Sequence, residues 1–236
     1  MMSLVNALPG AVAQGLIWGI MAIGVYLTFR ILDIADLTVD GSLGTGGAVC
    51  IMLMLSGQNV WVAMAGATAA GMAAGLATGI LHTFMGIPAI LAGILTQLGL
   101  YSINLKTMGK ANQAINVDKY DLLVSLRFIR KVPFYKNTIL IVAIAIIILI
   151  AILYWFFGTE LGCSLRATGC NDKMARAQGI NTDLSRVLGL MISNGLVALS
   201  GAMLCQYQGF ADINMGRGAI VIGLAAVVIG KALLGK

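Results

Sequence analysis

Several apolar runs long enough to cross a bilayer constrain this chain more than any other feature. The clearest covers about residues 138–157, where nearly every residue is Ile, Ala or Leu and where Tyr154 and Trp155 close the run. About twenty apolar residues span a membrane as a helix, and Tyr and Trp concentrate at its interfaces. The chain is 59% hydrophobic and 10% charged, whereas soluble domains are roughly 45–50% apolar and 25% charged. The sequence therefore predicts an all-α polytopic membrane protein, built as a single transmembrane domain over residues 1–236.

We predict about seven membrane segments, some of them short or broken. They cover approximately residues 9–29, 41–55, 59–83, 88–105, 138–157, 184–206 and 220–234. Glycines at four-residue spacing predict close contacts between helices, at Gly15 and Gly19 in the first segment and at Gly71, Gly75 and Gly79 in the third. The second segment has only about 15 apolar residues and opens with several glycines, which is typical of a broken helix beside a transport path.

Two short stretches of the chain look alike. Ala35-Asp36-Leu37 is followed by Gly41, and Ala211-Asp212-Ile213 is followed by Gly216. An odd number of spans separates the two stretches, which indicates an inverted repeat with the substrate route between its copies. An aspartate at mid-bilayer costs about 2.5 to 3.5 kcal/mol, so Asp36 and Asp212 are predicted to face a pathway, a partner or the protein interior. The alternative for residues 30–41 is a solvated turn.

Uncharged polar residues inside apolar runs are further pathway candidates. Gln97 lies near the middle of its run, and Ser193 and Asn194 lie inside residues 184–206. We predict that all three line the pathway. For Gln97 the alternative is a hydrogen bond that holds two helices together.

Residues 160–183 form a charged, helix-competent island between two long apolar runs. Asn171 or Asp172 could cap a short helix that passes through Met174 and Ala175 and stops at Gly179. A helix of two turns, roughly 10 to 14 Å long, is not stable alone in water, so we expect something to pack on it. Its small residues suit docking into a cleft of another protein, and the alternative is an ordinary connecting loop.

The pattern G-x-x-x-R-A-T-G-x-N-x-x-M-A-x-x-x-G-I-N, which starts at Gly162, resembles the cytoplasmic coupling segment of ABC-transporter permeases. The branch that it resembles is the importer permeases related to branched-chain amino-acid and ribose systems. The likeness covers most of the chain and includes residues 33–41, 193–201 and 208–216. In that family the segment inserts into a cleft on a separate ATPase subunit. The resemblance thus implies a coupling role for Arg166, Ala167, Thr168, Gly169, Asn171, Asp172, Met174, Ala175 and Gly179.

The resemblance implies the transmembrane subunit of an importer in the bacterial cell membrane that works by alternating access. Its expected partners are a second permease chain in a homodimer, ABC ATPase subunits that bind ATP, an extracellular solute-binding protein and membrane lipid. We expect an amino acid as cargo, branched-chain or aromatic, because uncharged pathway groups suit a zwitterion. A sugar or a nucleoside is the alternative. Related permeases continue with more helices, so either the sequence is truncated at Lys236 or the last part lies beyond it.

No signature of catalysis or ATP binding is present in the sequence. It contains neither G-x-x-x-x-G-K-[ST] nor H-E-x-x-H, so the chain is expected to be no enzyme and to need no cofactor or metal of its own. We interpret the only histidine, His82, as structural, and the four scattered cysteines as small apolar residues. The net charge of +6 is spread out, which does not indicate nucleic-acid binding. A second hypothesis is an ion-coupled secondary transporter with Asp36, Asp40 or Asp212 as proton or sodium ligands.

The orientation rests on two conflicting signals. Residues 107–137 form a basic loop on the opposite side of the membrane from residues 160–183, and the positive-inside rule would place that loop in the cytoplasm. The resemblance instead places residues 160–183 there. We follow the resemblance, with the N-terminus and residues 107–137 outside. Residues 120–132 suggest a strand or an interfacial helix, and the first eight residues lack the features of a removable signal peptide.

Overall fold

The computed structural model describes residues 2–115, 120, 122–125 and 138–234. In this part of the chain, six helices are long and apolar enough to cross a membrane. They are α1 (Met2–Tyr26), which continues as a π-helical turn (Leu27–Ile31), α2 (Thr38–Leu55), α3 (Val60–Thr83), α4 (Ala89–Met108), α5 (Thr138–Phe157) and α8 (Thr182–Gln208). The short helices α6 (Glu160–Cys170) and α7 (Asp172–Ala177) join α5 to α8, and the apolar helix α9 (Ala219–Leu234) follows. The prediction of an all-α membrane protein with about seven segments is confirmed.

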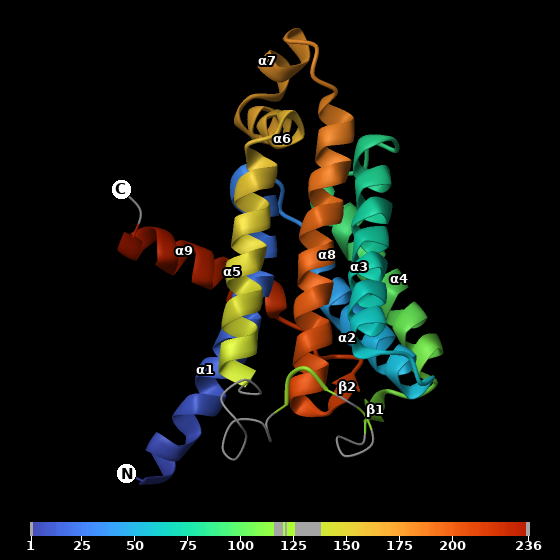
Figure 1. Cartoon of the computed structure of the whole chain (residues 1–236). Helices are drawn as coiled ribbons and strands as arrows, with labels where there is room; N and C mark the ends of the chain where they lie inside the picture. Colours follow the sequence, from blue (N-terminus) through green and yellow to red (C-terminus); the bar gives the residue numbers. More distant parts are fainter. Residues whose placement is uncertain (1, 116–119, 121, 126–137, 235–236) are drawn as a thin grey trace.

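The spanning helices run between two ends of the molecule (Figure 1). The α7 end carries α6 and α7, and the β end carries two short strands, β1 (Asn112–Ala114) and β2 (Phe210–Asp212). The strands pair antiparallel, with Gln113 opposite Ala211. The sequence analysis missed them, because three residues are too few to show a periodic pattern. The predicted strand or interfacial helix at 120–132 falls largely outside the described residues.

Helix α8 is the centre of the bundle and packs against α1, α2 and α3. In its most apolar stretch 72% of the residues are buried, whereas in the corresponding stretch of α5 only 11% are buried. Glycines of α3 allow the close approach to α8: a Cβ at Gly71 would collide with the Asn194 carbonyl, and one at Gly75 with the Leu190 carbonyl. The contact predicted from this glycine row is therefore confirmed.

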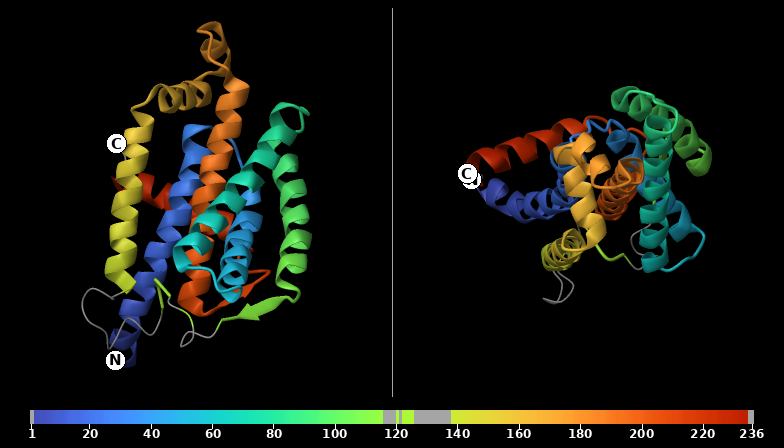
Figure 2. Two further views of the ribbon diagram at one scale, coloured as in Figure 1. Left: turned by 45° about the vertical axis from the view of Figure 1, so that its right-hand side comes forward. Right: turned by 90° about the horizontal axis from the view of Figure 1, so that it is seen from above.

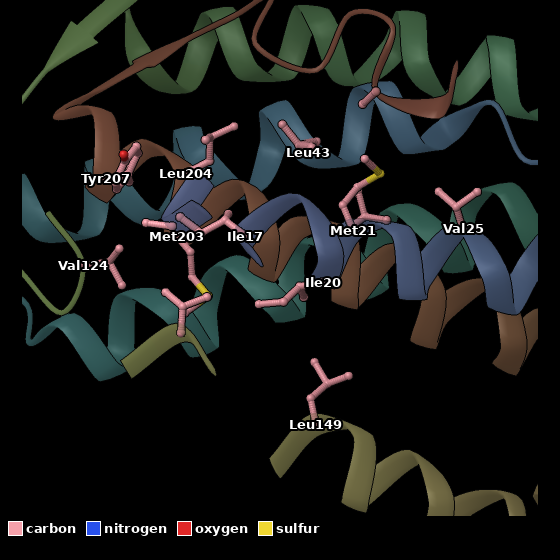
Figure 3. Close-up of a cluster of buried hydrophobic side chains, with 14 of the residues drawn as sticks. Ile17, Ile20, Met21, Val25, Leu43, Val124, Leu149, Met203, Leu204 and Tyr207 are labelled. Atoms are coloured by element: carbon pink, nitrogen blue, oxygen red, sulfur yellow. The ribbon is translucent and has the colours of Figure 1, made fainter. Parts of the chain in front are cut away.

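The main hydrophobic core lies where α1, α2 and α8 meet. Figure 3 shows Ile17 and Met21 of α1, Leu43 of α2 and Leu204 of α8 in this cluster. The predicted contact at Gly15 and Gly19 is wrong within the described chain, since a Cβ at either position would meet no atom within 4 Å. The buried face of α1 includes Ile17 and Met21, and the glycine pair lies on the other side of the helix.

Two non-helical segments enter the bundle from opposite ends (Figure 2). Residues 32–37 lead from the α7 end to the start of α2, and residues 213–218 lead from the β end to the start of α9. Asp36 Oδ1 accepts the Thr38 N–H at 2.8 Å, and Asp212 Oδ1 accepts the Asn214 N–H at 2.7 Å. Both aspartates thus form the same local turn, as expected for two copies of one repeated structural element.

Candidate functional site

The predicted coupling segment forms two short helices at the α7 end (Figure 2). Asn171 caps α7, since its side-chain oxygen accepts the Met174 N–H at 3.1 Å. Gly179 has a φ of +83°, and beyond it the Ile180 N–H donates to the Ala175 carbonyl at 3.1 Å. A glycine in this left-handed conformation is a common helix stop. Of the two caps considered, Asn171 is the one used. Helix α6, which the sequence analysis did not separate from α7, precedes it.

An ion-pair network holds α7 against the start of α8. Asp172 lies 3.3 Å from Arg186 and 3.5 Å from Arg176, and Arg176 lies 2.9 Å from Asp183. Burial raises the pKa of Asp172, but the Thr182 hydroxyl and the two guanidinium groups together lower it further, so this pKa lies below its ordinary value. Asp172 is therefore ionised at neutral pH, and the network sets the direction of α7.

The surface of α7 that is open to a partner is narrower than the sequence indicates. Met174 is 62% exposed, and Lys173 beside it is also exposed. Ala175 is only 3% exposed, and Thr168 is buried as well. Met174 can thus reach a cleft in another protein, whereas Ala175 and Thr168 hold the helices in place.

Arg166 and Ala167 belong to the framework of the same helix pair. The Arg166 guanidinium donates to the Phe157 carbonyl at 2.9 Å, which ties α6 to the end of α5. The Ala167 carbonyl accepts the Asn171 N–H at 3.0 Å, which shapes the junction between α6 and α7. The Arg166 side chain is exposed and Ala167 is half-buried.

Close packing connects α6 to the bundle interior. A Cβ at Gly169 would collide with the Ile31 carbonyl, so α6 lies directly against the π-helical end of α1. Leu165 of α6 is buried in one cluster with Leu32, Ile34 and Leu190. Because such contacts are close-packed, a movement of α6 must displace residues 31–34.

Asp36 and Asn194 meet inside the bundle. Asn194 Nδ2 donates to Asp36 Oδ2 at 2.6 Å, and the Ser42 hydroxyl donates to Asn194 Oδ1 at 2.6 Å. The Ser193 hydroxyl donates to the Gly24 carbonyl at 2.7 Å. All four side chains that take part are buried. In this conformation Asp36, Ser193 and Asn194 hold α8 to α1 and to the start of α2.

A second buried chain of hydrogen bonds escaped the sequence analysis. The Thr38 and Thr78 hydroxyls are 2.7 Å apart, and the Thr78 hydroxyl donates to Thr96 at 3.0 Å. The chain joins α2, α3 and α4. Threonines inside apolar runs were visible in the sequence, but their partners were not.

Gln97 lines a polar cavity of about 370 Å³ between α2, α4 and the segment that leads into α9. Its wall is formed by Asp40, Gly41, Gln97, Leu98, Tyr101, Asn104, Ile213 and Arg217. Asp212 lies in β2 at the β end, where its Oδ2 accepts the Asn112 amide at 3.4 Å. The sequence analysis assigned no pathway role to Tyr101, Asn104 or Arg217, although a polar residue in an apolar helix was a usable signal at Asn104.

The described residues contain no group of three or more His, Cys, Asp or Glu side chains that could hold a metal. The His82 ring shares a 2.9 Å hydrogen bond with the Ile87 carbonyl and so supports the turn between α3 and α4. Cys50 and Cys205 are buried, as small apolar residues would be. Cys163 and Cys170 are exposed.

Comparisons with known proteins match nearly the whole chain. The family model described as branched-chain amino acid transport system / permease component matches residues 8–235. A tyrosine transport system permease protein of Clostridioides difficile (strain R20291) is 39% identical over 234 residues, which cover 98% of this chain and 75% of that protein. An uncharacterized protein of Rickettsia prowazekii (strain Madrid E) is 37% identical, over 97% of this chain and 78% of its own length.

A more distant relative is the autoinducer 2 import system permease protein of Yersinia pestis (strain Pestoides F). It is 31% identical, over 92% of this chain and 60% of its own length. No solved structure matches the chain.

Proposed function

Because the chain belongs to the branched-chain amino acid transport system / permease component family, we propose that it is the membrane subunit of an ATP-driven amino-acid importer. It is a multi-pass permease of the bacterial plasma membrane. The relative named for tyrosine transport, at 39% identity over 98% of the chain, supports an amino acid as cargo. A branched-chain or aromatic amino acid fits that support.

The observation that carries the proposal is the α6–α7 pair beyond the ends of the spanning helices (Figure 1). Its geometry is fixed by the Asn171 cap and by the ion pairs of Asp172, yet Met174 remains 62% exposed. A rigid helix with a large exposed apolar side chain suits a cleft in a partner, and an ABC ATPase subunit is the partner that we propose. That subunit would bind and hydrolyse the ATP.

The contacts of α6 supply a route from such a partner to the bundle interior. A pull on α7 would be passed to α6 and then, through Gly169 and Leu165, to Ile31 and Leu32. Residues 32–37 lead directly to Asp36, whose carboxylate is held by Asn194. We propose that the contact between Asp36 and Asn194 is where movement at the α7 end alters the packing of α2 on α8.

In this proposal the α7 end faces the cytoplasm and the β end faces outward. An extracellular solute-binding protein would then deliver cargo at the β end. A second copy of the chain would complete the path. Leu98 and Tyr101, at the rim of the polar cavity between α2 and α4, are exposed, so the cavity lies at the surface of the single chain. The polar groups that line the cavity would be costly against lipid, and a homodimer contact would shield these groups.

The aspartates of the competing secondary-transporter hypothesis have structural roles. Asp36 accepts hydrogen bonds from Thr38 and Asn194, and both oxygens of Asp40 accept backbone N–H groups at the start of α9. Asp212 forms a turn with Asn214. These contacts favour structural roles in helix caps and turns over a shared site for a proton or a sodium ion.

Reconstitution in proteoliposomes tests the proposal. The permease would be combined with a candidate ABC ATPase subunit and a candidate solute-binding protein from the same organism, and uptake of L-tyrosine, L-leucine, D-ribose and uridine would be measured. We expect uptake of an amino acid that requires ATP inside the vesicle. Uptake driven by a proton or sodium gradient without ATP would contradict the importer class, and uptake of only ribose or uridine would contradict the cargo.

A further inference from the structure

The cavity between α2, α4 and the segment that leads into α9 contains hydrogen-bonding groups that have no partner among the described residues. Gln97, Tyr101, Asn104 and Arg217 all line it, and none of their side chains hydrogen-bonds or ion-pairs with a residue of the described chain. Asn104 is the most informative, because it is only 3% exposed. Its amide lines the cavity without a hydrogen-bond partner among the described residues, so its donor and acceptor atoms are available to a ligand there.

Glycines bring the walls of the cavity together. A Cβ at Gly41 would lie 3.2 Å from Gln97 Cα, and a Cβ at Gly44 would lie 3.5 Å from Asn104 Nδ2. Gly216 packs against the carbonyl of Asp40, which brings the segment before α9 against the start of α2. The polar groups of three separate elements thus converge on one space.

The charges in the cavity wall balance. Asp40 contributes a carboxylate, and Arg217 contributes a guanidinium that has no ion-pair partner among the described residues. Each oxygen of Asp40 accepts one backbone N–H, from Gly218 at 3.0 Å and from Ile220 at 2.9 Å. A carboxylate oxygen has a second lone pair, so Asp40 can still accept from an ammonium group. One negative and one positive group suit a zwitterion better than a solute with net charge.

The size and the apolar part of the wall suit a single small solute. A volume of about 370 Å³ is near the lower limit of ligand pockets, which hold roughly 300 to 1,000 Å³. Leu98, Ile213 and the ring of Tyr101 supply apolar contact beside the charged pair. Such a wall accommodates an aliphatic or aromatic side chain.

We propose that this cavity is a recognition site for one amino acid, with its carboxylate bound to Arg217, its ammonium group bound to Asp40 and the Asn104 amide as a further partner. The proposal rests on the amino-acid importer proposed above and adds that the permease itself selects the cargo. The cavity includes Arg217 and Ile213 from the segment that enters from the β end.

Binding to the purified permease–ATPase complex, without the solute-binding protein, tests the site. The probes are L-tyrosine and L-leucine, each with its amide, which lacks the carboxylate charge. We expect the amides to bind at least tenfold more weakly than the acids in the wild type. In Arg217→Gln the affinity for the acids should fall at least tenfold, so that the acids bind no more tightly than the amides. Arg217→Lys should still bind the acids more tightly than the amides, but by a smaller factor than the wild type.

This loss of discrimination does not depend on the amount of folded protein, so a partly unstable variant still gives a result. Arg30→Gln is the matched control, because Arg30 is an exposed arginine near the α7 end, outside the cavity. The proposed site is wrong if wild type and Arg217→Gln prefer the acid over the amide to the same degree. It is also wrong if neither probe binds a complex that imports amino acids. Neither result contradicts the proposed importer function. If the reconstituted complex imports only ribose or uridine, the proposed cargo fails, and this inference fails with it.

Discussion

The carboxylate of Asp40 caps a helix that lies about 180 residues further along the chain: its Oδ1 accepts the Ile220 N–H at 2.9 Å. Its other oxygen accepts the Gly218 N–H at 3.0 Å. The two segments that enter the bundle from opposite ends are thus joined at the starts of α2 and α9. The first N–H groups of a helix carry partial positive charge, so the carboxylate stabilises α9 where it begins.

Replacement of Asp40 should loosen the start of α9. In Asp40→Asn one of the two accepting oxygens becomes an NH₂ group, which cannot accept, so we expect a loss of about 1 kcal/mol of local stability. Amide hydrogen exchange at residues 218–222 should accelerate about fivefold. Asp33→Asn serves as the control, because Asp33 is exposed. Unchanged exchange in Asp40→Asn would show that the cap contributes nothing.

A charge at the exposed tip of α7 should uncouple transport from ATP. Met174→Glu places a carboxylate on the surface proposed to enter the ATPase cleft, and we expect ATP-driven uptake to fall more than tenfold with normal amounts of inserted protein. Met85→Glu is the matched control, since Met85 is 65% exposed in the turn between α3 and α4 at the same end. Full uptake by Met174→Glu would contradict the coupling role. Ala175 is a poor test, because a large residue there would disturb the packing of α7 itself.

The glycine row of α3 should tolerate no side chain. Gly75→Leu drives a side chain into the backbone of α8 at Leu190, and overpacking of this kind costs about 1 to 3 kcal/mol or more. We expect the thermal unfolding midpoint of the purified protein to fall by several degrees. Gly99→Leu makes the same change at a position where a Cβ would meet no atom of the described residues within 4 Å, and it should leave the midpoint nearly unchanged. Equal effects of the two substitutions would contradict this packing argument.

Thiol labelling of intact cells should give the orientation. Cys163 and Cys170 are exposed at the α7 end, so an impermeant reagent should reach them only after the cells are permeabilised. With both changed to serine, a cysteine at Asn112 should be labelled from outside and one at Lys173 should not. The reverse pattern would show that the positive-inside rule is correct here and that α7 faces outward.

Much of the fold follows from local sequence. The apolar runs predict the spanning helices to within a few residues, because length and hydrophobicity alone decide whether a segment can cross a bilayer. Asn171 and Gly179 were recognisable as the start and stop of α7, since helix caps depend on single residue types. The glycine row of α3 also indicated a close contact, although not its partner.

The role of single residues depended on the tertiary structure. Ala175 has the same local sequence signal as an exposed alanine, yet it is buried in the structure, where α7 packs against α6 and α8. Asn194 was predicted to line a path, and the structure adds that its amide donates to Asp36, 158 residues away. No local pattern encodes a pairing at that distance, because it depends on which helices become neighbours.

By itself, the sequence determined the membrane class of this protein, its spans and the helix proposed to couple it to an ATPase. Only the tertiary structure decided which polar residues hold helices together and which remain free. Asn194 and Asn104 are both asparagines inside apolar helices, but Asn194 meets Asp36 and Ser42, whereas Asn104 lines a cavity without a partner in the described chain. The physical reason is that a buried amide acquires its role from the groups that packing places within hydrogen-bond distance.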